Sequence, residues 1–198
     1  ITNAVTSGSV GLSINGPMVG TTVSISGGIF TGVTGMLGYG TLSTGSLAVS
    51  GSKFVSTDSA AGHAVYFTST LGDDIVAPFP IILKNVAMSG GNWGLIFDKA
   101  QTGLDLSLSD ATISTAGATG QGILLSAMTV AGGNIDISDV AISAAFTGIH
   151  VADLKAPLSL KKVTVSAGGN GWAFVTDAMT AASITIAGGS FSTSGTNT

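Results

Sequence analysis

The sequence contains 198 residues, of which 44% are hydrophobic and only 8% are charged. Its formal net charge is −4, every acidic residue is aspartate, every basic residue is lysine, and cysteine is absent. This composition excludes disulfide bonds, cysteine-ligated zinc and cysteine nucleophiles, and the lack of a basic cluster argues against nucleic acid as a partner.

Short strands dominate the expected secondary structure. The chain has 30 glycines and many short runs of β-branched residues, whereas the helix formers Glu and Arg are missing. We expect one all-β domain over residues 1–198, a segment or processed piece of a longer protein. Residues 1–22 should be irregular or form an N-terminal coil, and residues 23–198 should form repeated coils.

One repeated unit recurs along the chain. It consists of an apolar residue, any residue and a second apolar residue, with a third apolar residue seven positions after the first. Alternation in the first pair indicates a strand with one buried face, and the longer gap indicates a bend into a second strand. The copies are Leu12-Ser13-Ile14 with Val19, Val23-Ser24-Ile25 with Phe30, Leu47-Ala48-Val49 with Phe54, Ile81-Ile82-Leu83 with Met88, Leu106-Ser107-Leu108 with Ile113, Ile135-Asp136-Ile137 with Ile142, Leu158-Ser159-Leu160 with Val165, and Ile184-Thr185-Ile186 with Phe191.

A single corner residue is expected between the two strands of each unit. The residue four positions after each start is nearly always Gly, Asn or Asp, which tolerate a positive φ better than other residues. We therefore predict one left-handed residue at each corner. The predicted corner residues are Gly16, Gly27, Gly51, Asn85, Asp110, Asp139, Lys162 and Gly188.

A third strand, led by glycine, follows in the later units. Because the coils differ in length mainly before or after this strand, insertions should fall in two loops while the corner stays fixed. The predicted third strands begin at Gly62-His63-Ala64, Gly94-Leu95-Ile96, Gly122-Ile123-Leu124, Gly148-Ile149-His150 and Gly171-Trp172-Ala173.

Three short strands per coil, a one-residue corner and two variable loops resemble the right-handed parallel β-helix of pectate-lyase-like proteins, from Val23 to the C-terminus. The resemblance concerns architecture only, and it points to extracellular bacterial proteins of the adhesin or passenger type. It implies coils that pair with their neighbours and stack their inward side chains. The absence of arginine departs from the cationic groups with which pectate lyases handle uronic acids, so lyase activity is not expected.

The outer side of the third strands is the place where enzymes of this resemblance class hold a polysaccharide. If Leu95, Ile123 and Ile149 point inward, alternation turns the neighbouring positions outward. Such a stripe could be covered by loops, form an association surface, or bind an apolar or carbohydrate face, but it lacks the paired carboxylates of a glycosidase. The candidate binding residues are Tyr66, Trp93, Ile96, Leu124 and His150.

The sequence predicts no cofactor, and a bound calcium ion is the alternative. Asp98, Asp153 and Asp177 follow third strands and could form an acidic ridge, although neither an EF-hand nor a Gly-Gly-x-Gly-x-Asp array is present. His63 and His150 lie in different coils without a Cys or Glu to complete a metal set, so we expect each to be structural or exposed.

Two further predictions concern tryptophan and glycine. Trp172 takes the place of Ile149 in its coil and is expected in the core, whereas Trp93 precedes its strand and is expected outside. The glycine-rich stretches 35–40 and 117–122 lack a following helix or a Walker lysine, so they are interpreted as coil turns rather than phosphate-binding loops.

The predicted function is that of a noncatalytic, extracellular or cell-surface structural or adhesive solenoid. The strands at the two ends of a coil stack have unpaired edges. We therefore expect other subunits or flanking domains to bind there as partners. The alternative is a polysaccharide-binding or polysaccharide-degrading fragment, with glycan as the ligand. No apolar stretch approaches the roughly 18 residues of a membrane helix, so this segment should not insert into a membrane.

Overall fold

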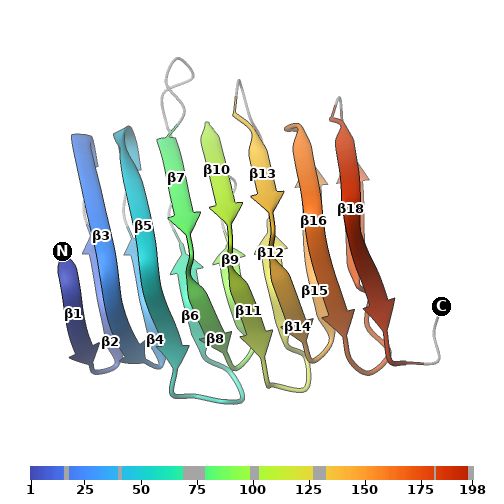
Figure 1. The fold of residues 1–198 in the computed structure, drawn as a ribbon, viewed down its shortest axis with the longest axis horizontal. Helices are drawn as coiled ribbons and strands as arrows, with labels where there is room; N and C mark the ends of the chain where they lie inside the picture. The colour runs from blue at the N-terminus through green and yellow to red at the C-terminus, as the bar shows by residue number, and fades with distance from the viewer. Residues whose placement is uncertain are drawn as a thin grey trace.

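The chain forms a parallel β-solenoid of about seven turns in a computed structural model, as the sequence predicts. The structure describes residues 1–15, 18–39, 42–68, 79–98, 103–126, 133–180 and 182–195. The coils follow one another along one axis, with β1 at one end and β18 at the other (Figure 1). No helix among the described residues has the length and hydrophobicity needed to cross a membrane.

Two faces of the solenoid belong to one eleven-stranded sheet that bends at a corner. We call the part before the corner the first face and the part after it the second face. In four coils a single long strand runs through the corner: β3 (Met18–Gly32), β5 (Leu42–Ser56), β16 (Leu158–Ala167) and β18 (Ile184–Thr193). In three further coils the corner separates two strands: β7 (Phe79–Lys84) from β8 (Ala87–Gly90), β10 (Leu104–Ser109) from β11 (Thr112–Thr115), and β13 (Ile135–Ser138) from β14 (Ala141–Ala144). Strand β1 (Thr2–Ser7) pairs mainly with the second-face part of β3.

The corner is the most regular feature of the backbone. Seven of the eight predicted corner residues have φ between 51° and 73°, which confirms the left-handed conformation there. Asn3, with φ of 50°, forms an additional corner that the repeat did not predict. Gly16, the eighth predicted corner residue, lies outside the described residues. The confirmed corners are Gly27, Gly51, Asn85, Asp110, Asp139, Lys162 and Gly188.

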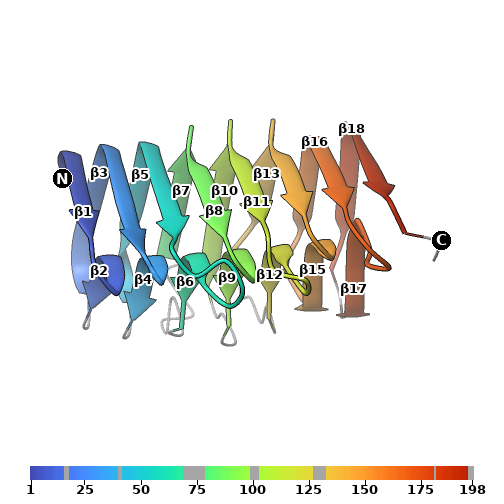
Figure 2. The same cartoon turned by 90° about the horizontal axis from the view of Figure 1, so that it is seen from below.

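The third face is a separate seven-stranded parallel sheet, which we call the third sheet. Its strands lie together on the side away from the first face (Figure 2). The predicted third strands correspond to the last five of its members. The strands are β2 (Val10–Asn15), β4 (Thr34–Tyr39), β6 (His63–Phe67), β9 (Trp93–Phe97), β12 (Gln121–Leu125), β15 (Thr147–Leu154) and β17 (Phe174–Met179).

Two predictions for the first coils were wrong. Leu12 does not start a first-face strand, because it lies in β2 and pairs with Met36 of β4 in the third sheet. Residues 35–39 form β4 rather than a turn. Its glycines permit close packing: a Cβ on Gly38 would lie 2.2 Å from the Phe67 ring, and one on Gly35 would lie 2.6 Å from the Ala64 carbonyl oxygen.

The core consists of inward side chains stacked along the axis. Every predicted apolar position of the repeat from Leu47 to Val165 is at most 3% exposed. Aromatic rings stack between neighbouring coils: the ring centroids are 5.3 Å apart for Phe30 and Phe54 and 4.7 Å apart for Phe67 and Phe97. Each buried side chain of this size contributes about 1.5–3 kcal/mol to folding, so the columns supply most of the stability of the scaffold.

Candidate functional site

The outward stripe predicted on the third sheet exists as a ladder of in-register residues. Tyr66 pairs with Ile96, Ile96 with Leu124, Leu124 with His150, and His150 with Val175. The inward neighbours Leu95 and Ile123 are fully buried in the core, so alternation turns the stripe residues to the other side of their strands. The structure therefore brings four of the five candidate binding residues into one line.

The fifth candidate residue, Trp93, lies in a second outward ladder that the sequence did not reveal. Alternation is interrupted in β6, where Ala64 and Val65 are both buried, so that His63 and Tyr66 both lie on the outer side. His63 pairs with Trp93 and Trp93 with Gln121 on successive coils. The contributions of His63 and Gln121 were missed because two consecutive inward residues break the period of two on which the prediction relied.

Three rings form a continuous stack on this surface, which we call the aromatic stack: Tyr66, His63 and Trp93. The His63 ring lies 4.6 Å from the Tyr66 ring and 4.8 Å from the Trp93 ring, with interplanar angles of 12° and 17°. The Tyr66 hydroxyl donates a hydrogen bond of 2.9 Å to Oδ2 of Asp98 in the next coil. Burial and then the Asp98 carboxylate raise the pKa of Tyr66 above its usual value of 10.0, so the phenol stays protonated.

The aromatic stack and the neighbouring Gln121 contain polar atoms without partners. His63 Nδ1, Trp93 Nε1 and Gln121 Oε1 are buried and form no hydrogen bond. A buried polar atom that lacks a partner costs about 1–3 kcal/mol, and such atoms are rare in folded proteins. Three of them at one ladder position on successive coils therefore mark this surface as unusual.

The charge of His63 follows from its position in the stack. Burial lowers the pKa of His63 below 6.5, and the opposing electrostatic effects of Asp98 and Asp58 are smaller. The ring is therefore neutral at neutral pH, with one nitrogen as a donor and the other as an acceptor. Within the described residues, neither His63 nor His150 forms a hydrogen bond with a serine or threonine hydroxyl.

The remaining stripe residues differ in their exposure. Ile96 is only 3% exposed although it lies outside the main core cluster, whereas Leu124 and His150 are half-buried. His150 Nε2 lies 2.9 Å from Oδ2 of Asp177 in the next coil. Because Asp177 follows Val175 by two residues and Asp98 follows Ile96 by two, the His150–Asp177 and Tyr66–Asp98 contacts repeat the same diagonal geometry.

The three calcium candidates lie in strands of the third sheet or directly after one, and they contact different partners. Asp98 bonds Tyr66, Asp153 forms an ion pair of 2.9 Å with Lys155, and Asp177 contacts His150. No group of three or more metal-ligating side chains is found in the described part of the chain. The adjacent carboxylates Asp73 and Asp74 lie outside the described residues.

Trp172 does not lie in the core, so the prediction of a buried position for this residue was wrong. The side chain is 55% exposed and packs edge-on against Phe146 with a centroid distance of 6.4 Å. The partner of Ile149 is Phe174, because β17 begins two residues later than the alignment on Gly171 suggests. A shift of two residues keeps the same face inward, so apolar alternation alone could not detect it.

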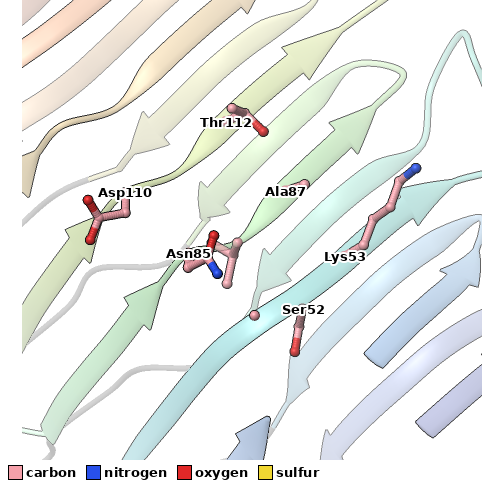
Figure 3. A pocket seen from close by; sticks show the side chains of 8 residues that line it. Ser52, Lys53, Asn85, Ala87, Asp110 and Thr112 are labelled. Carbon is pink, nitrogen blue, oxygen red and sulfur yellow. The ribbon is translucent and has the colours of Figure 1, made fainter. Parts of the chain in front are cut away.

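A hollow of about 260 Å³ lies at the corner between the first and second faces, on a different side of the solenoid from the third sheet. Figure 3 shows Lys53, Asn85 and Asp110 around it. Lys53 pairs with Ala87, which pairs with Thr112, so a short methyl side chain between two longer ones leaves the space. The hollow carries one ammonium and one carboxylate group at its rim.

No protein-family model, curated protein or solved structure matches this chain. The architecture itself defines the class: the protein is an all-β, parallel β-solenoid built from repeated coils. The site geometry adds an outward aromatic stack and two carboxylate contacts on one of its three faces.

Proposed function

We propose that the protein is a noncatalytic, extracellular structural or adhesive solenoid, such as a surface adhesin, a secreted passenger or a filament subunit. The observation that carries this proposal is the location of the exposed large apolar side chains. Among the residues that the structure describes, all but Ile82 belong to the first two coils or to the last two coils. They are Ile1, Val5, Ile29, Val33, Tyr39, Trp172, Met179 and Ile186.

Strand edges at both ends of the stack support association there. Among the described residues, β18 pairs only with β16, and β2 pairs only with β4. An unpaired edge offers a row of backbone donors and acceptors to another strand, and apolar side chains beside it favour burial. The expected partners are other subunits or flanking domains that continue the stack.

The extracellular setting and the kinship with bacterial adhesins and passengers are part of the same proposal. A sequence with 8% charged residues and no cysteine has the small, polar, uncharged composition that is common in exported bacterial surface proteins. The coil architecture fits such proteins because each coil adds length and surface without requiring a new fold.

Association through the ends can be tested by placing a charge on them. We expect Val5→Lys and Ile186→Lys to reduce self-association in sedimentation velocity and to shorten assemblies in electron micrographs. Ile82→Lys is the matched control, because Ile82 is 44% exposed but lies in a central coil. Strictly monomeric behaviour of the parent protein at all concentrations, or equal effects of all three substitutions, would contradict self-assembly.

Polysaccharide binding or cleavage is the second candidate function, and the aromatic stack beside Asp98 favours it. Product analysis after incubation with polysaccharides separates the two versions. Cleavage that is lost in Asp98→Asn or Asp153→Asn would establish an enzyme. Binding of a polysaccharide without release of cleavage products would establish a binding module.

A further inference from the structure

We propose that Asn170 is a site of spontaneous modification, where its side-chain amide is converted to aspartate and isoaspartate through a cyclic imide formed with Gly171. The reaction adds a negative charge to the turn that leads into β17, near the C-terminal end of the stack. This modification is independent of the proposed function, because it needs neither a partner nor association through the ends.

The chemistry requires only the chain and water. The backbone nitrogen of Gly171 gives up its proton and attacks Cγ of Asn170, so that a C–N bond closes the imide ring. The side-chain nitrogen of Asn170 takes up a proton and leaves as ammonia. Water then opens the ring at either carbonyl group, which yields aspartate or isoaspartate. Glycine favours the attack because no Cβ hinders the approach of its nitrogen.

Packing between coils requires the glycine that makes this pair reactive. A Cβ on Gly171 would collide with the carbonyl oxygen of Phe146 in the preceding coil. The Asn170 side chain is exposed, and within the described residues it forms no hydrogen bond that would hold its amide away from the Gly171 nitrogen. Asn15 also precedes a glycine, but Gly16 lies outside the described residues.

The turn around Asn170 is held more loosely than the equivalent turn two coils earlier. The N–H of Gly171 donates to the carbonyl oxygen of Gly168 at 3.4 Å, whereas the N–H of Gly120 donates to the carbonyl oxygen of Gly117 at 2.7 Å. A hydrogen bond at the longer distance is weaker. The Gly171 nitrogen is therefore released for the reaction at a lower cost in free energy.

The position of the turn in the stack also favours the reaction. Gly171 is buried, so the turn must open before its nitrogen can attack. The strand that follows, β17, pairs only with β15 among the described residues, whereas β12, which follows the turn at Gly120, pairs with both β9 and β15. A segment with fewer neighbours opens locally at a lower free energy. The rate of conversion should therefore report how often this part of the solenoid opens.

The products change the turn in two ways. Both place a carboxylate next to Trp172, whose side chain is exposed near the end of the stack. Isoaspartate also lengthens the backbone by a carbon atom, because the main chain then runs through the former side-chain carbonyl. The longer backbone cannot keep Gly171 in its close fit against Phe146. We therefore expect the start of β17 to loosen after the conversion.

The test is incubation of the folded Thr119→Asn protein in neutral buffer. This substitution places a second Asn-Gly pair in the tighter turn at Gly120, so the two sites are compared within one molecule. Peptide mapping by mass spectrometry measures the conversion at each site, and isoaspartyl methyltransferase labelling identifies isoaspartate. We expect Asn170 to react about tenfold faster than the introduced site in the folded protein, and both to react at similar rates in urea.

Three results would overturn the inference. The first is an unmodified Asn170 in the folded protein after a time in which the unfolded chain reacts. The second is an equal rate at Asn170 and at position 119 in the folded protein. The third is unchanged hydrogen exchange of β17 in the converted parent protein. Asn170→Gln, whose longer side chain closes the ring far more slowly, is the control and should keep its original exchange after the same incubation.

Discussion

The central and terminal coils carry the same sequence pattern but bury it to different extents. Leu106 and Leu108 in a central coil are fully buried, whereas Ile186, at the equivalent position to Leu108 in the last coil, is 53% exposed. Ile184 and Phe191 are likewise only partly buried against the core. The difference shows that a coil gains its core from neighbours on both sides, because no single coil can enclose its own apolar residues.

The largest expected effect compares two phenylalanines. Phe97→Ala removes a fully buried ring stacked on Phe67, and we expect a loss of about 3–5 kcal/mol in the free energy of unfolding. Phe191→Ala should cost about 1 kcal/mol or less, because its site is open at one side and can relax. Urea denaturation followed by circular dichroism measures both, and similar losses would contradict the distinction between coils.

The corner residues give a second, smaller contrast. Asn85→Val places a β-branched residue at φ of 51° and should cost about 1–2 kcal/mol, whereas Asn85→Gly should be close to neutral. Asn3→Val, at φ of 50° in the first coil, should cost less, because a terminal coil can unfold locally. Thermal denaturation of the three variants checks the order. A loss in Asn85→Gly as large as in Asn85→Val would show that side-chain contacts, not φ, determine the corner.

The smallest effect concerns pH and the aromatic stack, which lies in central coils. Because the pKa of His63 is lowered on folding, the unfolded chain binds more protons between the folded pKa and 6.5. The free energy of unfolding should therefore be independent of His63 protonation above pH 6.5, and it should fall as the pH drops from 6.5 through the pKa of His63 in the folded protein. His63→Phe keeps a ring in the stack and should weaken this dependence, as measured by urea denaturation at several pH values. His150→Gln leaves His63 in place and serves as the control; an unaltered pH dependence in His63→Phe would refute the assignment.

The sequence predicted the features that repeat at fixed spacing. Corner residues such as Asn85 and Asp110 could be found because the four-residue offset is constant and the required φ limits the residue type. The inward columns could be found because a strand alternates strictly between its two faces. The outward order Tyr66, Ile96, Leu124, His150 followed from that same alternation.

The sequence could not predict features that depend on how one coil meets the next. Trp172 was misplaced because registers that differ by two residues have the same apolar pattern. The stacking of His63 between Tyr66 and Trp93 depends on a break in alternation and on the register between two coils. Strand β4 was missed because its glycines are typical of turns, although here they allow close approach to Phe67 and Ala64.

The parallel pairing of all coils also determines how the molecule would carry a mechanical load. The backbone hydrogen bonds between strands point from coil to coil along the axis, so the two ends of the stack are connected through these bonds in series. A pull that separates the ends loads every interface between coils, and a terminal coil gives way first because it has a neighbour on one side only. Each coil that peels away releases a chain segment on the order of 100 Å in extended length, since corners recur about every 25 residues and an extended residue spans about 3.5 Å. The scaffold would therefore lengthen in steps under tension while the coils that remain keep their surface intact.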